Sequence, residues 1–253
     1  MRWVPRLGVA LTIVLQILWP LADGPTRTTL TISTVLVFTT TTLSHAWIHR
    51  GGLWALAYAG ITMLFAFTLE AIGVATGIPF SPYSYSDALG LKLLDVPLLI
   101  PLAWTMMAYP ALLLARTLTA SAHRLITPLT AVTGAWALTS WDLFLDPQMV
   151  TAGYWTWVNP TPNLLGVSDI PAVNFLGWLF ATFALMLLLY KLPTDRPPSN
   201  QGVPASLWTW TWIGGVVANA FFFGRPAVAA WGGICMGLVT IPYLLALKRR
   251  ESA

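Results

Sequence analysis

The chain has 253 residues and a formal net charge of +4, with only 9% charged residues against 57% apolar ones. Soluble domains carry about 25% charged residues, so this composition excludes an ordinary soluble domain. The fold class that the sequence predicts is all-α, a polytopic integral membrane bundle, because only helices satisfy the backbone along such long apolar runs. The positive charges lie at the ends of these runs, where they set topology, so they do not indicate binding to nucleic acid.

The first apolar run follows Arg2 and Arg6 and so resembles the start of a signal peptide. No small-x-small cleavage site follows Ala22, and we therefore expect the first helix to be retained. We expect about eight helices in a single transmembrane domain, residues 1–253, with seven helices as the alternative. The eight expected ranges are 7–22, 28–48, 53–75, 97–118, 126–145, 171–190, 207–223 and 227–247.

Eight helices would place both ends of the chain on one side of the membrane. Of the 13 Lys and Arg residues, ten fall on that side, and only Arg27, Lys92 and Arg225 fall on the other. This imbalance predicts cytoplasmic termini in the plasma membrane. The Pro-rich segment 191–205 is then expected to be a cytoplasmic linker.

Acidic residues occur inside or at the end of two apolar runs. Glu70 lies within one run, which is followed by an aromatic loop and a second run; Asp142 and Asp146 end another run, which is also followed by an aromatic loop and a further run. In both cases the later run opens with Asp-x-Pro and carries a Trp nine residues after the Asp. We predict two helix-loop-helix units, 53–118 and 126–190, that bring acids and aromatic side chains to one place.

The three carboxyls are the candidate catalytic groups. An ionisable side chain inside an apolar helix costs about 2.5–3.5 kcal/mol on insertion scales, which favours a functional role for Glu70 over a structural hydrogen bond to another helix. Asp142 and Asp146 are four residues apart and share a helix face if the helix reaches Pro147, which disfavours its continuation. We expect at least one of the three to be protonated near neutral pH, as a general acid must be. For Asp146 a turn-forming Asp-Pro at the membrane surface is the alternative.

The two loops supply candidate binding residues. Their aromatic side chains are either a substrate wall or an interfacial belt, and Asn174 either orients a carboxyl or joins two helices. Asp87 and Asp95 are expected to be turn or cap residues. The predicted substrate-binding residues are Phe80, Tyr83, Tyr85, Trp104, Trp155, Trp157, Asn174 and Trp178, and the predicted structural residues are Gly73, Gly77, Pro97 and Pro171.

Metals and cofactors are not expected. His45 and His49 share a helix face, but with one further histidine and no adjoining acid they are expected to face lipid head groups. The neighbouring Thr39–Thr42 run should hydrogen-bond back to its own helix. No G-x-G-x-x-G opens a helix, so no flavin or nicotinamide is expected. The D-x-x-x-D spacing of the aspartates is similar to the magnesium-binding aspartates of membrane prenyltransferases, but the loops offer only Lys92 to a diphosphate.

Two ordered patterns carry a family resemblance. E-x-x-G-x-x-x-G-x-P-F-x-x-Y-x-Y begins at Glu70, and a second pattern from Asp142 to Trp178 contains D-P, G-Y-W-x-W and P-x-x-N-F-x-G-W. Together they resemble the membrane carotenoid hydratase family, also labelled carotenoid biosynthesis protein. Ser81 departs from the pattern, since a glycine is expected after Pro-Phe.

The resemblance implies that water adds to the terminal C=C bond of an acyclic carotenoid and gives a tertiary hydroxyl. The expected partners are the carotenoid, water and membrane lipid. The family supplies no catalytic roles, so we assign Glu70 and Asp142 as acid and base and expect Asp146 to tune Asp142. A prenyltransferase or cyclase acting on carotenoids, and a non-catalytic carotenoid-binding or transport protein, are the alternatives.

Overall fold

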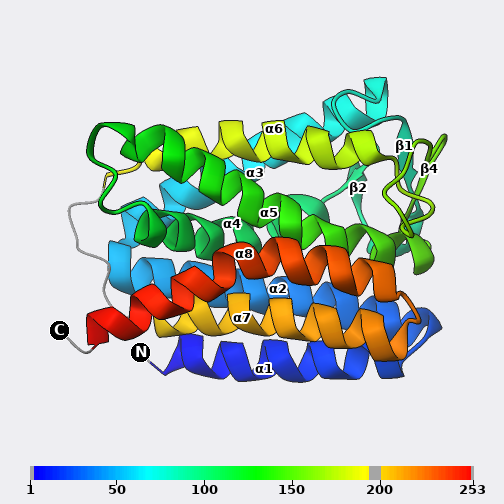
Figure 1. The fold of residues 1–253 in the computed structure, drawn as a ribbon. Helices are drawn as coiled ribbons and strands as arrows, with labels where there is room; N and C mark the ends of the chain where they lie inside the picture. Colours follow the sequence, from blue (N-terminus) through cyan, green and yellow to red (C-terminus); the bar gives the residue numbers. More distant parts are fainter. Residues whose placement is uncertain (1–2, 194–200, 252–253) are drawn as a thin grey trace.

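The computed structural model describes residues 3–193 and 201–251, and in this part of the chain eight α-helices form a bundle (Figure 1). The start of the first helix and the end of the last lie at the same end of the bundle. The predicted helical fold is confirmed, while the single domain stays a prediction. The helices are α1 (Val4–Leu18), α2 (Gly24–Arg50), α3 (Gly52–Thr76), α4 (Leu99–Leu118), α5 (Ile126–Thr151), α6 (Ala172–Tyr190), α7 (Gly202–Val217) and α8 (Pro226–Glu251).

Five segments are long and apolar enough to cross a membrane by length and composition, which indicates an integral membrane protein. They are α1 with the short 3₁₀ turn η1 (Trp19–Leu21), α3, α4, α6 and α8. Among the described residues, α2, α5 and α7 do not meet the same criteria. The orientation of the bundle in the membrane stays a prediction.

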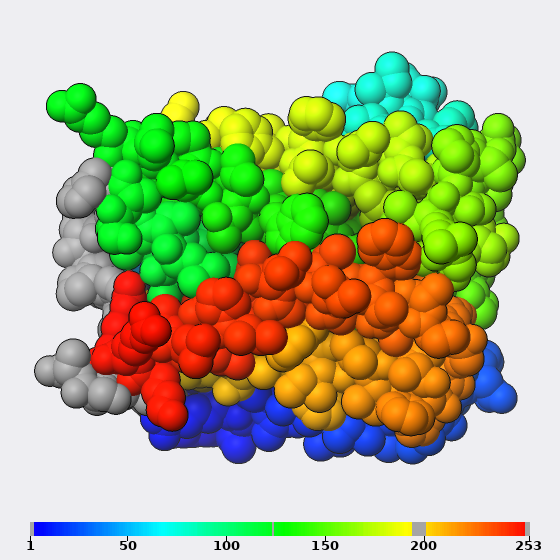
Figure 2. All heavy atoms as spheres, in the orientation of Figure 1, coloured from blue at the N-terminus to red at the C-terminus, as the bar shows by residue number. Residues whose placement is uncertain are grey.

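Helix α4 is the centre of the bundle, because it packs against α2, α3, α5, α6, α7 and α8. Sixteen of its 20 residues are buried. Figure 2 shows α8 lying across one face of the molecule, where it packs against α5 and α7. Helix α4 therefore lies between the surrounding helices, and its side chains face the space that these helices enclose.

The threonine run of α2 ties that helix to α4. Thr39 donates to the carbonyl of Leu102 at 3.0 Å, and Thr42 donates to that of Met106 at 3.1 Å. The expectation that this run bonds back to its own helix holds for Thr41, which donates to an α2 carbonyl, but is wrong for Thr39 and Thr42. Hydrogen bonds between helices replace the hydrophobic attraction that lipid cannot supply.

The two aromatic loops pair with each other as a small antiparallel ribbon of β1 (Tyr83–Tyr85) and β4 (Trp155–Trp157). Tyr83 lies opposite Trp157 and Tyr85 opposite Trp155, so the four rings share one face. Ser84 and Thr156 point to the other, exposed face. No strands were expected here. The Tyr-Ser-Tyr and Trp-Thr-Trp alternation is the period-two signal that predicts them.

A second small hairpin follows the ribbon strand β1. It joins β2 (Lys92–Leu93) to β3 (Val96–Pro97) through Leu94 and Asp95, both at positive φ (50° and 63°), as a two-residue hairpin turn requires. Asp87 opens a short 3₁₀ turn and pairs with Lys92 at 2.7 Å. The turn interpretation of Asp87 and Asp95 therefore agrees with the structure.

Helix α5 does not end at Pro147, which corrects the sequence-based boundary. The proline removes one backbone donor, a cost of about 3 kcal/mol, but residues beyond it resume the helical pattern. Arg225 stabilises this turn by donating to the Pro147 carbonyl at 2.8 Å. The extension adds a last turn, Gln148–Thr151, close to the aspartates.

Two further expectations are wrong. Helix α7 begins at Gly202, so residues 202–205 of the predicted linker are helical, while its residues 194–200 lie outside the described part of the chain. His45 does not face head groups: it is buried, and its Nδ1 lies 3.1 Å from the hydroxyl of Tyr109 on α4. A buried imidazole needs such a partner because water cannot reach it.

Ser81 has a φ of 95°, which glycine adopts readily and other residues do not. Such a conformation costs about 1–3 kcal/mol. We therefore expect Ser81→Gly to raise the free energy of unfolding by about 1 kcal/mol, measured by thermal unfolding in detergent. Gly77→Ala is the opposing control, because Gly77 also has positive φ and an added Cβ would lie 2.9 Å from the Pro82 ring. Equal unfolding temperatures for Ser81→Gly and the parent would contradict the assigned strain.

Candidate functional site

Glu70 lies on α3 and accepts hydrogen bonds from two other elements. Its Oε2 accepts from the hydroxyls of Tyr83 (2.5 Å) and Tyr85 (2.8 Å) on the ribbon. Its Oε1 accepts from the indole Nε1 of Trp104 on α4 at 3.1 Å. The carboxyl is buried, yet both of its oxygens have partners, as a buried acid requires.

Gly73 makes this arrangement possible, because it lies one turn after Glu70 on the same face of α3. A Cβ at Gly73 would lie 2.9 Å from the Tyr83 hydroxyl and 3.1 Å from the Phe80 ring. A larger side chain would therefore push the ribbon away from Glu70. Gly77 then ends α3 in the left-handed conformation and starts the loop that leads to the ribbon.

The second acidic group is a pair of carboxyls held by one amide. Asn174, in the first turn of α6, directs its Nδ2 to Asp142 Oδ2 (3.1 Å) and to Asp146 Oδ2 (2.5 Å) on α5. Trp155 of the ribbon donates from Nε1 to Asp146 Oδ1 at 2.9 Å. The Asn174 amide therefore links the two carboxyls. Asp142 Oδ1 is buried without a partner.

The ribbon brings the two acidic groups together. Tyr85 donates to Glu70, Trp155 donates to Asp146, and these two residues lie opposite each other with ring centroids 5.6 Å apart. Burial, and then the neighbouring Glu70 carboxyl, raises the pKa of Tyr83 and Tyr85, so both hydroxyls remain donors at neutral pH. The two predicted helix-loop-helix units thus meet at one site.

A cavity of about 530 Å³ adjoins these groups. Its lining includes Glu70 and Asp146 but not Asp142, which lies against Asn174 and Asp146. From this end the cavity extends between α2 and α4 towards α1 and α7. The lining contains all eight predicted substrate-binding residues: Phe80, Tyr83, Tyr85, Trp104, Trp155, Trp157, Asn174 and Trp178.

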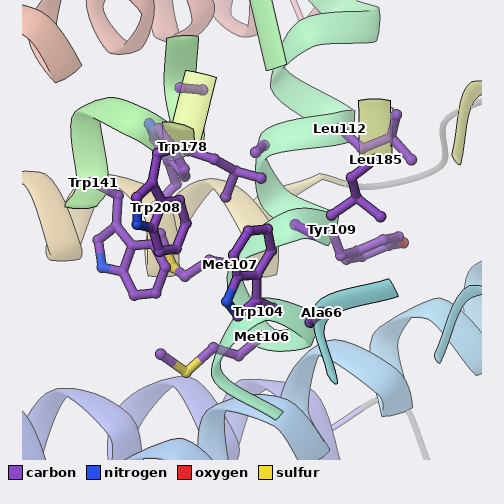
Figure 3. Packing of buried hydrophobic residues seen from close by; sticks show 14 of the residues in the cluster. Ala66, Trp104, Met106, Met107, Tyr109, Leu112, Trp141, Trp178, Leu185 and Trp208 are labelled. Atoms are coloured by element: carbon purple, nitrogen blue, oxygen red, sulfur yellow. The ribbon is translucent and has the colours of Figure 1, made fainter. Parts of the chain in front are cut away.

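Stacked indoles form one wall of the cavity. Trp104 and Trp178 stack with ring centroids 4.4 Å apart and planes inclined by 13°, and Trp141 meets Trp178 edge to face at 6.0 Å. Figure 3 shows these three indoles close together in the interior. Their π faces make this wall apolar and able to attract a cation.

Sequence reasoning missed several lining residues. Trp141 adjoins Asp142 in the sequence, and that adjacency was a usable signal. Met149 lies one turn beyond Asp146 on the same face, but the expected helix end excluded it. Trp210 belongs to a Trp208–Trp210–Trp212 alternation, a pattern that by itself indicates only packing or an interfacial belt. In the structure the indoles of Trp208 and Trp212 donate hydrogen bonds to α8, and Trp210 lines the cavity.

The basic residue that the two loops contain is already engaged. Lys92, the cation that the loops offer, donates to the Tyr85 carbonyl and pairs with exposed Asp87. In the described part of the chain, no group of three or more His, Cys, Asp and Glu residues is arranged to hold a metal ion. Pro97 lies in strand β3 and Pro171 immediately before α6.

Residues 31–241 match the family described as carotenoid biosynthesis protein. The chain belongs to this family. The predicted resemblance is therefore confirmed. A curated relative, named bisanhydrobacterioruberin hydratase, from Haloarcula japonica, is 32% identical over 154 residues, which cover 58% of this chain and 47% of that protein. The match thus spans about half the length of the relative. No solved structure matches the chain.

The amide bridge predicts that stability lost by changing Asn174 to a carboxyl is recovered when Asp142 is changed to an amide. Asn174→Asp adds a third carboxyl and removes the shared donor, so the free energy of unfolding should fall by about 3 kcal/mol. Adding Asp142→Asn restores one amide and two carboxyls at the same place and should recover most of that loss. Thermal unfolding of both single variants and the double variant in detergent measures the coupling. Strictly additive effects would contradict the bridge.

Proposed function

We propose that this member of the carotenoid biosynthesis protein family is a hydratase that adds water to the terminal C=C bond of an acyclic carotenoid. The observation that carries the proposal is the cavity itself, an apolar, aromatic-walled space with carboxyls gathered at one end. A polyene fits such walls, and protonation of its terminal alkene needs a positioned acid. The hydratase name of the relative from Haloarcula japonica supports the same reaction.

The Asp142–Asp146 pair is the proton donor in this proposal. Two carboxylates that share one amide donor in a buried site repel each other when both are ionised, so one of them holds a proton. Asp146 lines the cavity and Asp142 does not. Asp146 therefore delivers the proton to the substrate, and Asp142 holds the Asp146 carboxyl in place. This reverses the roles expected from the sequence, in which Asp142 was the catalytic member and Asp146 tuned it.

Glu70 is the base, because its hydrogen bonds all come from phenol and indole donors, which suit an acceptor carboxylate. The proton from Asp146 forms a C–H bond at the less substituted alkene carbon and leaves a tertiary cation. The Trp104 and Trp178 faces and the Glu70 charge stabilise this cation. Water forms the C–O bond and gives its proton to Glu70. Proton return from Glu70 to the aspartate pair completes the net addition of water.

The alternatives have less support. A prenyltransferase needs metal-binding aspartates and a diphosphate site, whereas Asp146 accepts N–H donors on both oxygens and Lys92 is paired with Asp87. A carotenoid cyclase would use the same acid and aromatic walls without adding water. A binding or transport protein would leave the pigment unchanged. The mass of the product, together with whether any new pigment forms, separates these functions.

Expression in a host that accumulates an acyclic carotenoid tests the reaction. We expect a pigment heavier by one water, formed without molecular oxygen and carrying the oxygen atom of labelled water. Mass spectrometry of the extracted pigments measures this. An isomer of unchanged mass would indicate a cyclase. An unchanged pigment profile across several acyclic carotenoids would overturn the hydratase proposal.

The carboxyl roles predict an order among amide variants. Glu70→Gln and Asp146→Asn keep size but remove proton transfer, so each should lower turnover about 100-fold or more. Asp142→Asn should have a smaller effect, because Asp142 acts through Asp146 and does not line the cavity. Initial rates and carotenoid bound per protein are measured together for each purified variant. Wild-type rates for Glu70→Gln and Asp146→Asn would make these carboxyls structural.

A further inference from the structure

The cavity has exposed lining on one side of the molecule. Ile17, Ile213, Val217 and Phe222 line it and are also exposed at the protein surface, by 47%, 47%, 41% and 55% respectively. They belong to α1, to α7 and to the π-helical turn η4 (Ala218–Phe222) that continues α7. The other lining residues, including all those from α2 to α6 and the ribbon, are buried or half-buried. The cavity therefore opens to the surface between α1 and α7.

We propose that this opening is a lateral mouth through which an acyclic polyene enters from the lipid, with its distal part remaining between α1 and α7. The inference rests on the proposed function and adds the route and the second subsite of the substrate. The four residues of the rim are apolar, so they present the surface that hydrocarbon chains contact. The carboxyls lie at the opposite, buried end of the cavity.

The size of the cavity requires such an opening. About 530 Å³ lies within the range of pockets that enclose drug-sized ligands. A carotenoid is a longer, rigid chain and cannot fold back on itself within that space. When its terminal alkene lies at Glu70 and Asp146, the rest of the polyene must leave through the exposed side of the lining.

Two glycines on α7 shape the passage. A Cβ at Gly215 would lie 2.8 Å from the Phe144 ring, so this glycine lets α5 pack closely against α7. For a Cβ at Gly214 the nearest atoms belong to the Trp210 ring, at 3.6 Å or more, which is ordinary van der Waals contact. Gly214 lines the cavity without filling it, and its position next to Ile213 places it at the rim. It is therefore the position where an added side chain narrows the mouth without disturbing a packed neighbour.

The mouth lies near the end of the bundle that carries the ribbon. Ile17 is in the last turn of α1, and Phe222 is the last residue of η4. Figure 1 shows these ends of α1 and α7 at the same end of the bundle as β1 and β4. The polyene thus enters from the membrane leaflet on the ribbon side and reaches the carboxyls without crossing the bundle.

Gly214→Phe tests the mouth, with Gly60→Phe as the matched control. Gly60 is an exposed helical glycine on α3 whose added Cβ meets nothing within 4 Å, and it does not line the cavity. Total carotenoid bound per protein, substrate and product together, is measured after purification from a host that makes an acyclic carotenoid. We expect at least a tenfold loss for Gly214→Phe and near wild-type binding for Gly60→Phe.

If Gly214→Phe binds as much carotenoid per protein as the wild type, the proposed mouth is overturned, whether or not the bound pigment has gained water. Bound pigment that never gains water, with binding still blocked by Gly214→Phe, would overturn the hydratase proposal and keep the mouth. A wild-type protein that binds no acyclic carotenoid would overturn both.

A second measurement covers the case in which Gly214→Phe does not fold. A photoreactive benzophenone side chain replaces Ile213, or Leu64 as a control that is 69% exposed on α3 and does not line the cavity. Illumination should yield a carotenoid adduct at position 213 and none above background at position 64. Equal adduct yields at the two positions would overturn the mouth.

Discussion

The structure depends on the burial of three carboxyls inside a helical bundle, where no lysine or arginine of the described residues pairs with them. Unpartnered polar groups in such an interior are costly, and an ionisable one inside an apolar helix is costlier still. Here the hydrogen bonds come from neutral side chains: two phenols and an indole for Glu70, and an indole and an amide for Asp146. These donors come from four different elements, namely β1, β4, α4 and α6. The acids thus require the ribbon to close over them, and the ribbon requires Gly73 to approach α3.

Neutral donors also leave the carboxyls able to exchange protons, which ion pairs with lysine or arginine would hinder. A lysine or arginine beside Glu70 or Asp146 would fix the carboxylate as an ion and compete with a developing carbocation for its charge. Phenol, indole and amide groups orient the carboxyls and add no positive charge. Lys92, the nearest basic residue of the loops, is held away by Asp87 and by the Tyr85 carbonyl. The same arrangement therefore solves the problem of burial and leaves the acids available for proton transfer.

The sequence predicted the parts of this site whose signals are local. Glu70 stands out because a carboxylate interrupts an apolar run, and the aromatic loops stand out by composition. The pairing of β1 with β4 joins residues about 70 positions apart, so only the three-residue alternations hinted at it. The helix end at Pro147 was misplaced because a local rule about proline was overridden by packing and by Arg225. The ranking of Asp142 over Asp146 could not be corrected from sequence, since both share a face and only the tertiary structure decides which lines the cavity. No sequence pattern marked Trp210 or Gly214 as cavity residues, because α7 contributes to the cavity through its position beside α1, which only the tertiary structure shows.

In the proposed reaction, the placement of polar and apolar lining separates the carotenoid from the water. Water is needed only where the alkene is protonated, and the carboxyls, phenols and the Asn174 amide that can bind it gather at the ribbon end. The rim between α1 and α7 is apolar, so hydrocarbon approaches from lipid while ionic or strongly hydrated molecules have no favourable contacts there. A terminal alkene that reaches the carboxyls has the rest of its chain filling the passage behind it. In the proposed reaction the cation forms in a space closed by its own substrate on one side and by stacked indoles on another, and the polar groups beside Glu70 and Asp146 hold the water that captures it. Under this proposal, selective hydration at the chain end follows from the geometry, because internal double bonds of the same polyene remain in the passage, away from both the acid and the water.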